Sequence, residues 1–211
     1  MPFAKGAKAT PTYFRARSGA LVGIKRVFSL TTVIIVSGAP ASGKSVLSKW
    51  LSQELGLHLL SKDLIKEKLF DELGCETRAK SIELGQASFA ILLERCRDRV
   101  LAYESFIVES AFRKCDGASL TALFQNYRII HVNCLAPAEA IIARFELRAF
   151  SGDRHPGHLD TENVGELSRM LEDGVFDIVI PGAIRADVHT TDFSSQMYSV
   201  AKTKVLHEYV N

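Results

Sequence analysis

Hydrophobic positions along the chain follow two alternating patterns, and together they predict a sheet interleaved with helices. Short apolar runs rich in β-branched residues, at 32–37 and 127–134, predict buried strands. Apolar residues at helical spacing, at 45–55 and 78–104, predict amphipathic helices. Strands separated by helices indicate an α/β fold with a parallel sheet and helices on both faces.

The other expected elements continue this order along the chain. Further strands are predicted at 57–60, 106–108, 176–180 and 188–190, and further helices at 64–73, 138–148 and 195–209. Pro137 stands where the helix at 138 would begin, and Gly74 follows the helix that ends at 73. No element is predicted for residues 159–175, which are polar and poorly periodic. We expect one domain over residues 31–211.

The first 30 residues differ in charge from this domain. Lysine and arginine occur throughout them, whereas the first acidic residue of the chain is Glu54. This predicts a basic N-terminal tail, and three explanations stay open for it. It can be a disordered segment, the product of a start codon placed too far upstream, or an organelle transit peptide.

Composition excludes several classes of protein. The chain has 211 residues, of which 47% are hydrophobic and 24% charged, as in globular domains. No apolar run approaches the roughly 18 residues of a membrane span. A net charge of +2 argues against nucleic acid as the main partner. The four cysteines form no C-x-x-C pair, which favours reduced thiols in a cytosolic protein over a zinc site or a disulfide framework.

One motif points to chemistry, because residues 38–45 (GAPASGKS) fit G-x-x-x-x-G-K-[ST] and stand between a predicted strand and a predicted helix. Such a loop wraps a phosphate with its backbone N–H groups, its lysine reaches the β- and γ-phosphates, and its serine ligates Mg²⁺. We therefore predict ATP and Mg²⁺ as cofactors and Ser45 as a metal ligand. The predicted phosphate-binding residues are Gly38, Ala39, Pro40, Ala41, Ser42, Gly43, Lys44 and Ser45.

Three classes of protein share such a loop, and the rest of the sequence favours one of them. The N-K-x-D motif with which GTPases bind guanine does not occur. A motor-type ATPase should carry a strand that ends in Asp-Glu, whereas the best candidate, Phe106-Ile107-Val108-Glu109-Ser110, has a single acidic residue. A small phosphotransferase with a short α/β core and a helical lid remains.

At this point the sequence resembles the small P-loop kinases of the nucleoside-kinase-like group, in particular its AAA-type subgroup of "predicted kinases". Its layout is also similar to that of chloramphenicol phosphotransferase, the zeta toxins and polynucleotide 5′-hydroxyl kinases. The resemblance covers residues 32 to about 205. Its landmarks are the phosphate loop, Ser61-Lys62-Asp63, Val108-Glu109-Ser110 with Phe112 and Arg113, and the lid that contains Arg144, Arg148 and Arg154-His155-Pro156-Gly157-His158.

The resemblance implies roles for several of these residues. It makes Asp63 the general base for the acceptor hydroxyl, although a helix N-cap is the alternative. Glu109, at the end of a strand beside the loop, can hold a water of Mg²⁺ or a substrate hydroxyl, or it can be a supporting hydrogen-bond partner. Arg113 can contact the acceptor or lie in solvent.

The lid supplies further candidates. Arg144 and Arg148 share one helix face and suit the charge of a phosphoryl transition state, with surface ion pairs as the alternative. Arg154 is a third candidate. His155 and His158 are expected in a turn, and contact with the substrate is the alternative that stays open for them. Residues 190–192 (Thr-Thr-Asp) resemble the family's stretch near the adenine, although a helix cap explains them equally well.

We therefore expect an ATP- and Mg²⁺-dependent kinase that phosphorylates a hydroxyl of a small molecule such as a metabolite, an antibiotic or a sugar nucleotide. A polynucleotide 5′-hydroxyl kinase and a nucleotide-binding regulator or toxin-type protein with little turnover are the alternatives. No membrane or protein partner is indicated. The expected compartment is the cytoplasm, or an organelle if the tail is a transit peptide.

Overall fold

The computed structural model describes residues 31–150, 155, 164–192 and 195–210, so the predicted tail at 1–30 lies outside the described residues. Five parallel strands form one sheet in the order β2-β3-β1-β4-β5. They are β1 (Thr32–Ser37), β2 (His58–Ser61), β3 (Phe106–Glu109), β4 (Arg128–Leu135) and β5 (Ile184–His189). The predicted parallel α/β sheet is confirmed.

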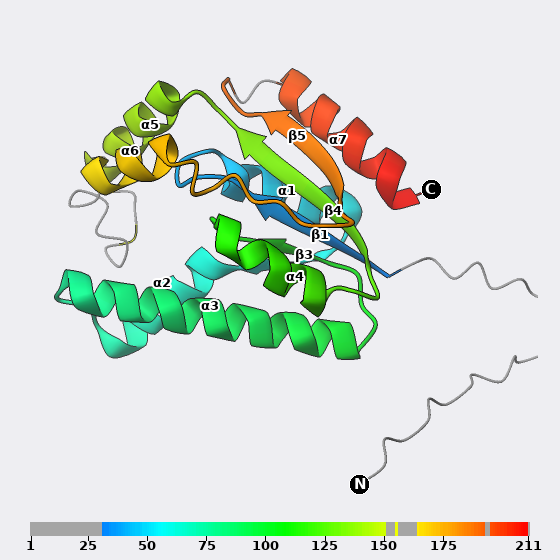
Figure 1. The fold of residues 1–211 in the computed structure, drawn as a ribbon, viewed down its shortest axis with the longest axis horizontal. Helices are drawn as coiled ribbons and strands as arrows, with labels where there is room; N and C mark the ends of the chain where they lie inside the picture. The colour runs from blue at the N-terminus through cyan, green and yellow to red at the C-terminus, as the bar shows by residue number, and fades with distance from the viewer. Residues whose placement is uncertain (1–30, 151–154, 156–163, 193–194, 211) are drawn as a thin grey trace, which may run out of the picture. The chain divides into compact units, whose positions relative to one another are not determined.

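Helices cover both faces of this sheet (Figure 1). They are α1 (Lys44–Leu55), α2 (Lys62–Leu73), α3 (Arg78–Leu101), α4 (Gly117–Leu123), α5 (Ala138–Phe150), α6 (Val164–Glu172) and α7 (Ser195–Val210), with a 3₁₀ turn, η1, at Lys114–Asp116. Apolar side chains of α1 and α7 pack on one face, and those of α2, α3 and α4 pack on the other. Within the described part of the chain, no helix is both long and apolar enough to cross a membrane.

The central strand β1 explains why the core has two halves. Val33 and Ile35 point into the cluster under α2, α3 and α4, whereas Ile34 and Val36 point into the cluster under α1 and α7. All four side chains are fully buried. A strand that is covered on both faces must be apolar throughout, which is the pattern expected of a parallel sheet.

The strand order also determines where the chemistry gathers. Because all strands are parallel, their carboxyl ends meet at one edge of the sheet, where doubly wound folds bind ligands. The phosphate loop follows β1, Ser61 ends β2 and Glu109 ends β3 at this edge. A third apolar cluster, which includes Ile141 of α5 and Leu167 of α6, packs α5 and α6 beside Ala39 of the loop.

The structure corrects one predicted strand and adds two helices. Residues 176–180 form no strand, although Ile178 and Ile180 are buried as their apolar character requires. This segment packs on α4, where a Cβ on Gly117 would lie 2.2 Å from the carbonyl oxygen of Val179. The last strand, β5, is six residues long and begins at Ile184 instead of 188. Neither α4 nor α6 was predicted.

All four cysteines are free thiols, but they differ in exposure. Cys96 and Cys134 are buried, and burial raises the pKa of each thiol to about 12. Such thiols are poor nucleophiles at neutral pH, because the thiolate is the reactive form. Cys75 is half-buried and Cys115 is exposed.

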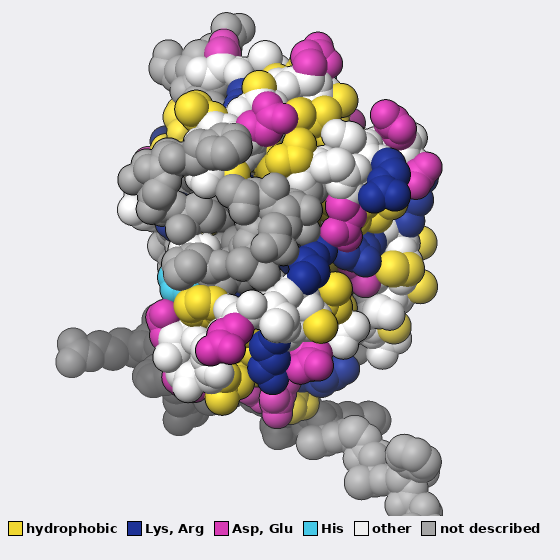
Figure 2. Space-filling model, turned by 90° about the vertical axis from the view of Figure 1, so that its left-hand side faces the viewer, with side chains coloured by type: hydrophobic (Ala, Val, Ile, Leu, Met, Phe, Trp, Pro, Cys, Tyr) yellow, Lys and Arg dark blue, Asp and Glu magenta, His cyan; other side chains and the backbone are white. Residues whose placement is uncertain are grey.

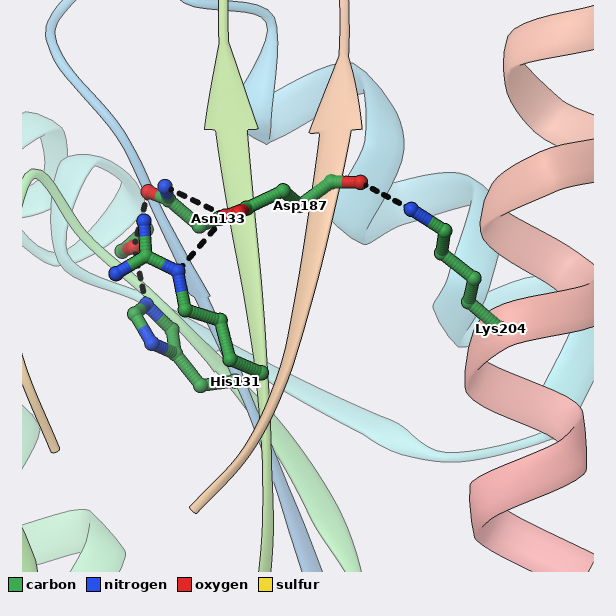
Figure 3. A network of polar contacts seen from close by, with 6 residues as sticks. His131, Asn133, Asp187 and Lys204 are labelled. Atoms are coloured by element: carbon green, nitrogen blue, oxygen red, sulfur yellow. Dashed lines mark hydrogen bonds and ion pairs between the residues drawn. The ribbon is translucent and has the colours of Figure 1, made fainter. Parts of the chain in front are cut away.

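A polar network, buried at Ser37, His131 and Asn133, joins β1, β4 and β5 directly before the phosphate loop (Figure 3). His131 Nε2 lies 2.6 Å from Ser37 Oγ, which donates to Asn133 Oδ1 at 3.3 Å. Asn133 Nδ2 donates in turn to Asp187 Oδ1 at 3.0 Å. Lys204 Nζ, from α7, donates to the backbone oxygen of Asp187. The last residue of β1 is therefore held by two side chains of β4, one of which is bound in turn by Asp187 of β5.

We predict that His131 makes the stability of the fold depend on pH. Burial, together with the charge of Arg185, lowers the pKa of His131 to about 4, although the charge of Asp187 opposes this shift. The unfolded chain therefore binds more protons than the folded chain between about pH 4 and 6.5, and acidification across this range lowers the free energy of unfolding by about 3 kcal/mol.

Urea unfolding at a series of pH values measures this effect. In His131→Gln, which keeps a polar group near Ser37, the free energy of unfolding should fall less steeply between pH 6.5 and 4 than in the wild type. Equal slopes for the two proteins would show that His131 does not carry the pH dependence.

Candidate active site

The phosphate loop has the backbone geometry of an anion cradle. Gly38 and Gly43 have φ angles of 143° and 86°, which favour glycine. A Cβ on Gly38 would lie 2.5 Å from Ser42 Oγ and 2.7 Å from the carbonyl oxygen of Cys134, so this position has no room for a side chain. Ser42 Oγ is buried and has no hydrogen-bond partner among the described residues. The loop thus presents polar groups and the start of α1, which fits a phosphate.

The end of β5 holds this loop from the other side. Thr190 Oγ1 donates to the carbonyl oxygen of Ser42 at 2.5 Å, and Thr190 N donates to the carbonyl oxygen of Leu135 at 2.8 Å. Arg144 Nη2 donates to the carbonyl oxygens of Thr190, at 2.9 Å, and Thr191. The stretch predicted near the adenine therefore lies against the loop, while adenine contact itself stays a prediction.

Glu109 is the central carboxylate of the site and is 1% exposed. Ser45 Oγ donates to its Oε1 at 3.3 Å, and Ser61 Oγ donates to its Oε2 at 2.7 Å. Lys44 Nζ lies 3.9 Å from Oε1. Burial raises the pKa of Glu109, whereas the charge of Lys44 and the two hydroxyl donors lower it and Asp63 raises it. One carboxylate thus connects the phosphate loop to the ends of β2 and β3.

The same group of atoms fits Mg²⁺. This ion prefers oxygen ligands and takes only one or two from a protein when it also binds substrate phosphates. The hydroxyl of Ser45 and the carboxylate of Glu109 offer such oxygens next to the loop. Ser45 and Glu109 are therefore the residues that would hold the ion, either directly or through water.

Asp63 lies inside the first turn of α2, one residue after the start of the helix, and not before it. Ser61 occupies the N-cap position, but its side chain makes no capping bond because it binds Glu109. Asp63 is half-buried and lines a cavity that Lys44 also lines. The position is compatible with a base that faces an acceptor, and the role of Asp63 stays a prediction.

This cavity has a volume of about 560 Å³, which is within the range of small-molecule sites. Its walls come from the phosphate loop, α2, α3, the segment after β3, and the helices α5 and α6. Phe89, Phe145 and Phe176 give it an apolar part, and charged side chains surround the rest. Figure 2 shows this side of the molecule, where basic and acidic side chains lie next to one another.

Of the other predicted site residues, two line the cavity and one of the described residues does not. Arg113 and Arg148 line the cavity, and the guanidinium carbon of Arg148 lies 5.4 Å from the centre of the Phe145 ring. Arg144 does not line it and binds the carbonyl groups after β5, so this geometry gives no support to its predicted catalytic role. Arg154 and His158 lie outside the described residues.

His155, which the sequence analysis named, is not among the residues that line the cavity. Its Nε2 lies 3.0 Å from Asp71 Oδ1, and its ring meets Phe70 edge-on, so His155 contacts α2.

Three residues of the cavity were missed by the sequence analysis. Lys66 was not singled out, although it stands four residues after Lys62 and shares its helix face. Gly85 and Phe89 of α3 were not considered either, because nothing in their spacing distinguishes a cavity wall from a buried helix face.

Comparison with known proteins identifies the family. A model of the family described as "AAA domain" matches residues 33–173. The chain belongs to this family. The predicted P-loop fold and the resemblance to small P-loop kinases are thereby confirmed.

Individual relatives agree with this assignment. A candidate kinase from Chloroflexus aurantiacus is 31% identical, with a TM-score of 0.70 over 84% of this chain and 96% of that one. A sugar kinase from Janibacter sp. is 17% identical, with a TM-score of 0.53 over 83% of this chain and 94% of its own, and shows the shared fold alone. A cytidylate kinase from Ignicoccus hospitalis is 46% identical over 43 residues, which are 20% of this chain and 25% of that enzyme. The match thus spans a quarter of this curated relative. Taken together, the relatives support a phosphotransferase of the kinase type.

Proposed function

We propose that the protein transfers the γ-phosphoryl group of ATP to a hydroxyl of a small molecule. The observation that carries this proposal is the cavity of about 560 Å³, because it is lined by both Lys44 of the phosphate loop and the carboxylate-bearing Asp63. A hydroxyl bound in this cavity lies between a group for the phosphates and a group for its proton. The candidate kinase that is 31% identical supports the same reaction type.

Each residue of the site has its own role in this reaction. The loop N–H groups and Lys44 bind the β- and γ-phosphates, and Ser45 and Glu109 would hold Mg²⁺, which would neutralise phosphate charge. The acceptor oxygen forms a bond to the γ-phosphorus while the bond from that phosphorus to the bridging oxygen breaks, and ADP leaves with this oxygen. Asp63 takes the hydroxyl proton. Arg148, in the cavity wall, stabilises the charge of the transferring group.

Transfer of labelled γ-phosphate from MgATP tests this proposal. The acceptors are pooled sugars, nucleosides, aminoglycoside and phenicol antibiotics, 5′-hydroxyl oligonucleotides and cytidylate. We expect a labelled phosphate ester of a small hydroxyl compound.

The other outcomes overturn the proposal in different ways. A labelled oligonucleotide as the main product would make the protein a polynucleotide kinase. Transfer to the phosphate of cytidylate would replace the hydroxyl acceptor with a phosphate acceptor. Tight binding of MgATP without product in any pool would indicate a regulator instead of an enzyme.

A further inference from the structure

The cavity wall has more positive than negative side chains, and two of its cations, Lys62 and Lys66, have no role in the proposed reaction. Among the described residues, six Lys or Arg side chains line the cavity, against three Asp or Glu. Two of the three carboxylates have partners of their own. Arg78 Nη2 lies 2.6 Å from Glu166 Oε2, and Asp116 Oδ2 accepts from the backbone N–H of Arg113 at 2.8 Å. The third carboxylate is Asp63, the proposed base, which is not free either, because its charge acts on Lys62.

Lys62 and Lys66 are the two cations that α2 contributes to the cavity wall. They stand four residues apart on α2 and so share one helix face, and both line the cavity. Among the described residues, no carboxylate lies within ion-pair distance of either ammonium group. Lys66 Nζ donates to Ser81 Oγ at 2.9 Å, and Ser81 is a neutral, buried residue of α3.

The titration of both lysines agrees with this geometry. Burial lowers the pKa of Lys62, and the charges of Arg113 and Lys44 lower it further, although the adjacent Asp63 opposes them. Burial also lowers the pKa of Lys66, and Lys62 is the next contributor in the same direction. Half-buried cations that repel each other are stabilised by an anion that binds between them.

We propose that the acceptor carries an anionic group, a carboxylate or a phosphate, in addition to the hydroxyl that is phosphorylated. This group binds to Lys62, Lys66 and the hydroxyl of Ser81. The inference rests on the proposed function, since it takes this cavity as the acceptor site.

The neighbouring helix α3 shows where the rest of such an acceptor fits. Gly85 and Phe89 of α3 line the cavity one helical turn apart. A Cβ on Gly85 would meet no atom within 4 Å, so the helix surface is open at this position. The carbon skeleton of the acceptor therefore fits over Gly85 and against Phe89. This places its anionic group at one end of the cavity and its hydroxyl toward Asp63.

Sulfate binding tests the anion site without knowledge of the acceptor. The full chain is saturated with MgADP, which occupies the phosphate loop, and its unfolding temperature is followed during titration with sodium sulfate at constant ionic strength. The double variant Lys62→Gln/Lys66→Gln should have an affinity for sulfate that is lower than that of the wild type by about tenfold or more. Its unfolding temperature without sulfate shows whether it is folded.

The matched control is Lys68→Gln, because Lys68 is an exposed lysine of the same helix that does not line the cavity. Its sulfate titration should follow the wild type. Equal titrations for the wild type and the folded double variant would overturn the anion site. If Lys68→Gln also binds sulfate about tenfold more weakly than the wild type, the anion site is overturned as well, because sulfate binding would then depend on net charge alone.

Transfer assays with matched acceptors identify the source of the anion and separate the two proposals. The pairs are gluconate with glucose, and ribose 5-phosphate with ribose. Preference for gluconate indicates a carboxylate, and preference for ribose 5-phosphate indicates a phosphate. Equal kcat/KM for charged and neutral members would overturn the anion site but keep the kinase. No product from any acceptor would count against the kinase, while the sulfate titration would still decide the anion site.

Discussion

Replacement of Asp63 by asparagine should lower kcat for phosphoryl transfer by about 10²- to 10⁴-fold, which is the usual contribution of a positioned general base. Asparagine has the shape of aspartate but cannot take the hydroxyl proton. The affinity for MgATP should change little, because Asp63 belongs to α2 and not to the phosphate loop. Steady-state kinetics with the acceptor identified by labelled transfer give kcat, and equilibrium titration gives the nucleotide affinity.

The control for this variant is Glu72→Gln, because Glu72 is an exposed acid of the same helix and does not line the cavity. It removes the same charge from α2 and should leave kcat unchanged. If Asp63→Asn keeps the kcat of the wild type, Asp63 is not the base. If Glu72→Gln is impaired as strongly, the loss reflects the charge of the helix and not proton transfer.

The elements next to the phosphate loop are the part of the fold that the sequence predicts best. The run at 32–37 matches β1 in both bounds, and the helix predicted from Ser45 begins one residue earlier, at Lys44. A doubly buried strand and a glycine-rich loop each impose strong local requirements on the chain. Local pattern is enough to locate them for this reason.

The strand order and the cavity could not be obtained in the same way. Ser61 and Glu109 are 48 residues apart and meet only because β2 pairs with β3. The apolar run at 176–180 predicted a strand, but its burial comes from packing on α4. Lys62, Lys66 and Gly85 form one wall only after α2 and α3 pack together. Each of these features depends on tertiary contacts that local pattern does not encode.

Replacement of Lys44 by alanine should weaken MgATP binding by about 10²-fold or more and abolish turnover. Lys44 is the loop cation that reaches the β- and γ-phosphates, and a charge-assisted contact of this kind contributes several kcal/mol. Calorimetric titration with MgATP measures the affinity. The control is Lys49→Ala, which removes an exposed lysine of the same helix and should bind MgATP like the wild type.

Loss of binding in Lys44→Ala has a second explanation that must be separated from the first. Lys44 is also the cation nearest to Glu109 in a buried setting, with Nζ 3.9 Å from Oε1. Removal of one partner of a buried ion pair costs about 3 kcal/mol of stability, so the variant can lose MgATP because its loop is no longer held in place.

The double variant Lys44→Ala/Glu109→Gln separates these explanations, because glutamine keeps the hydrogen-bonding shape of Glu109 without its charge. Its free energy of unfolding should exceed that of Lys44→Ala, while its affinity for ATP should stay as low when it is measured without Mg²⁺, because Glu109 is also a proposed Mg²⁺ ligand. Such a result assigns the loss of binding to the missing charge at the phosphates. Recovery of affinity together with stability would instead show that Lys44 acts mainly by neutralising Glu109, and its assignment to the phosphates would be wrong.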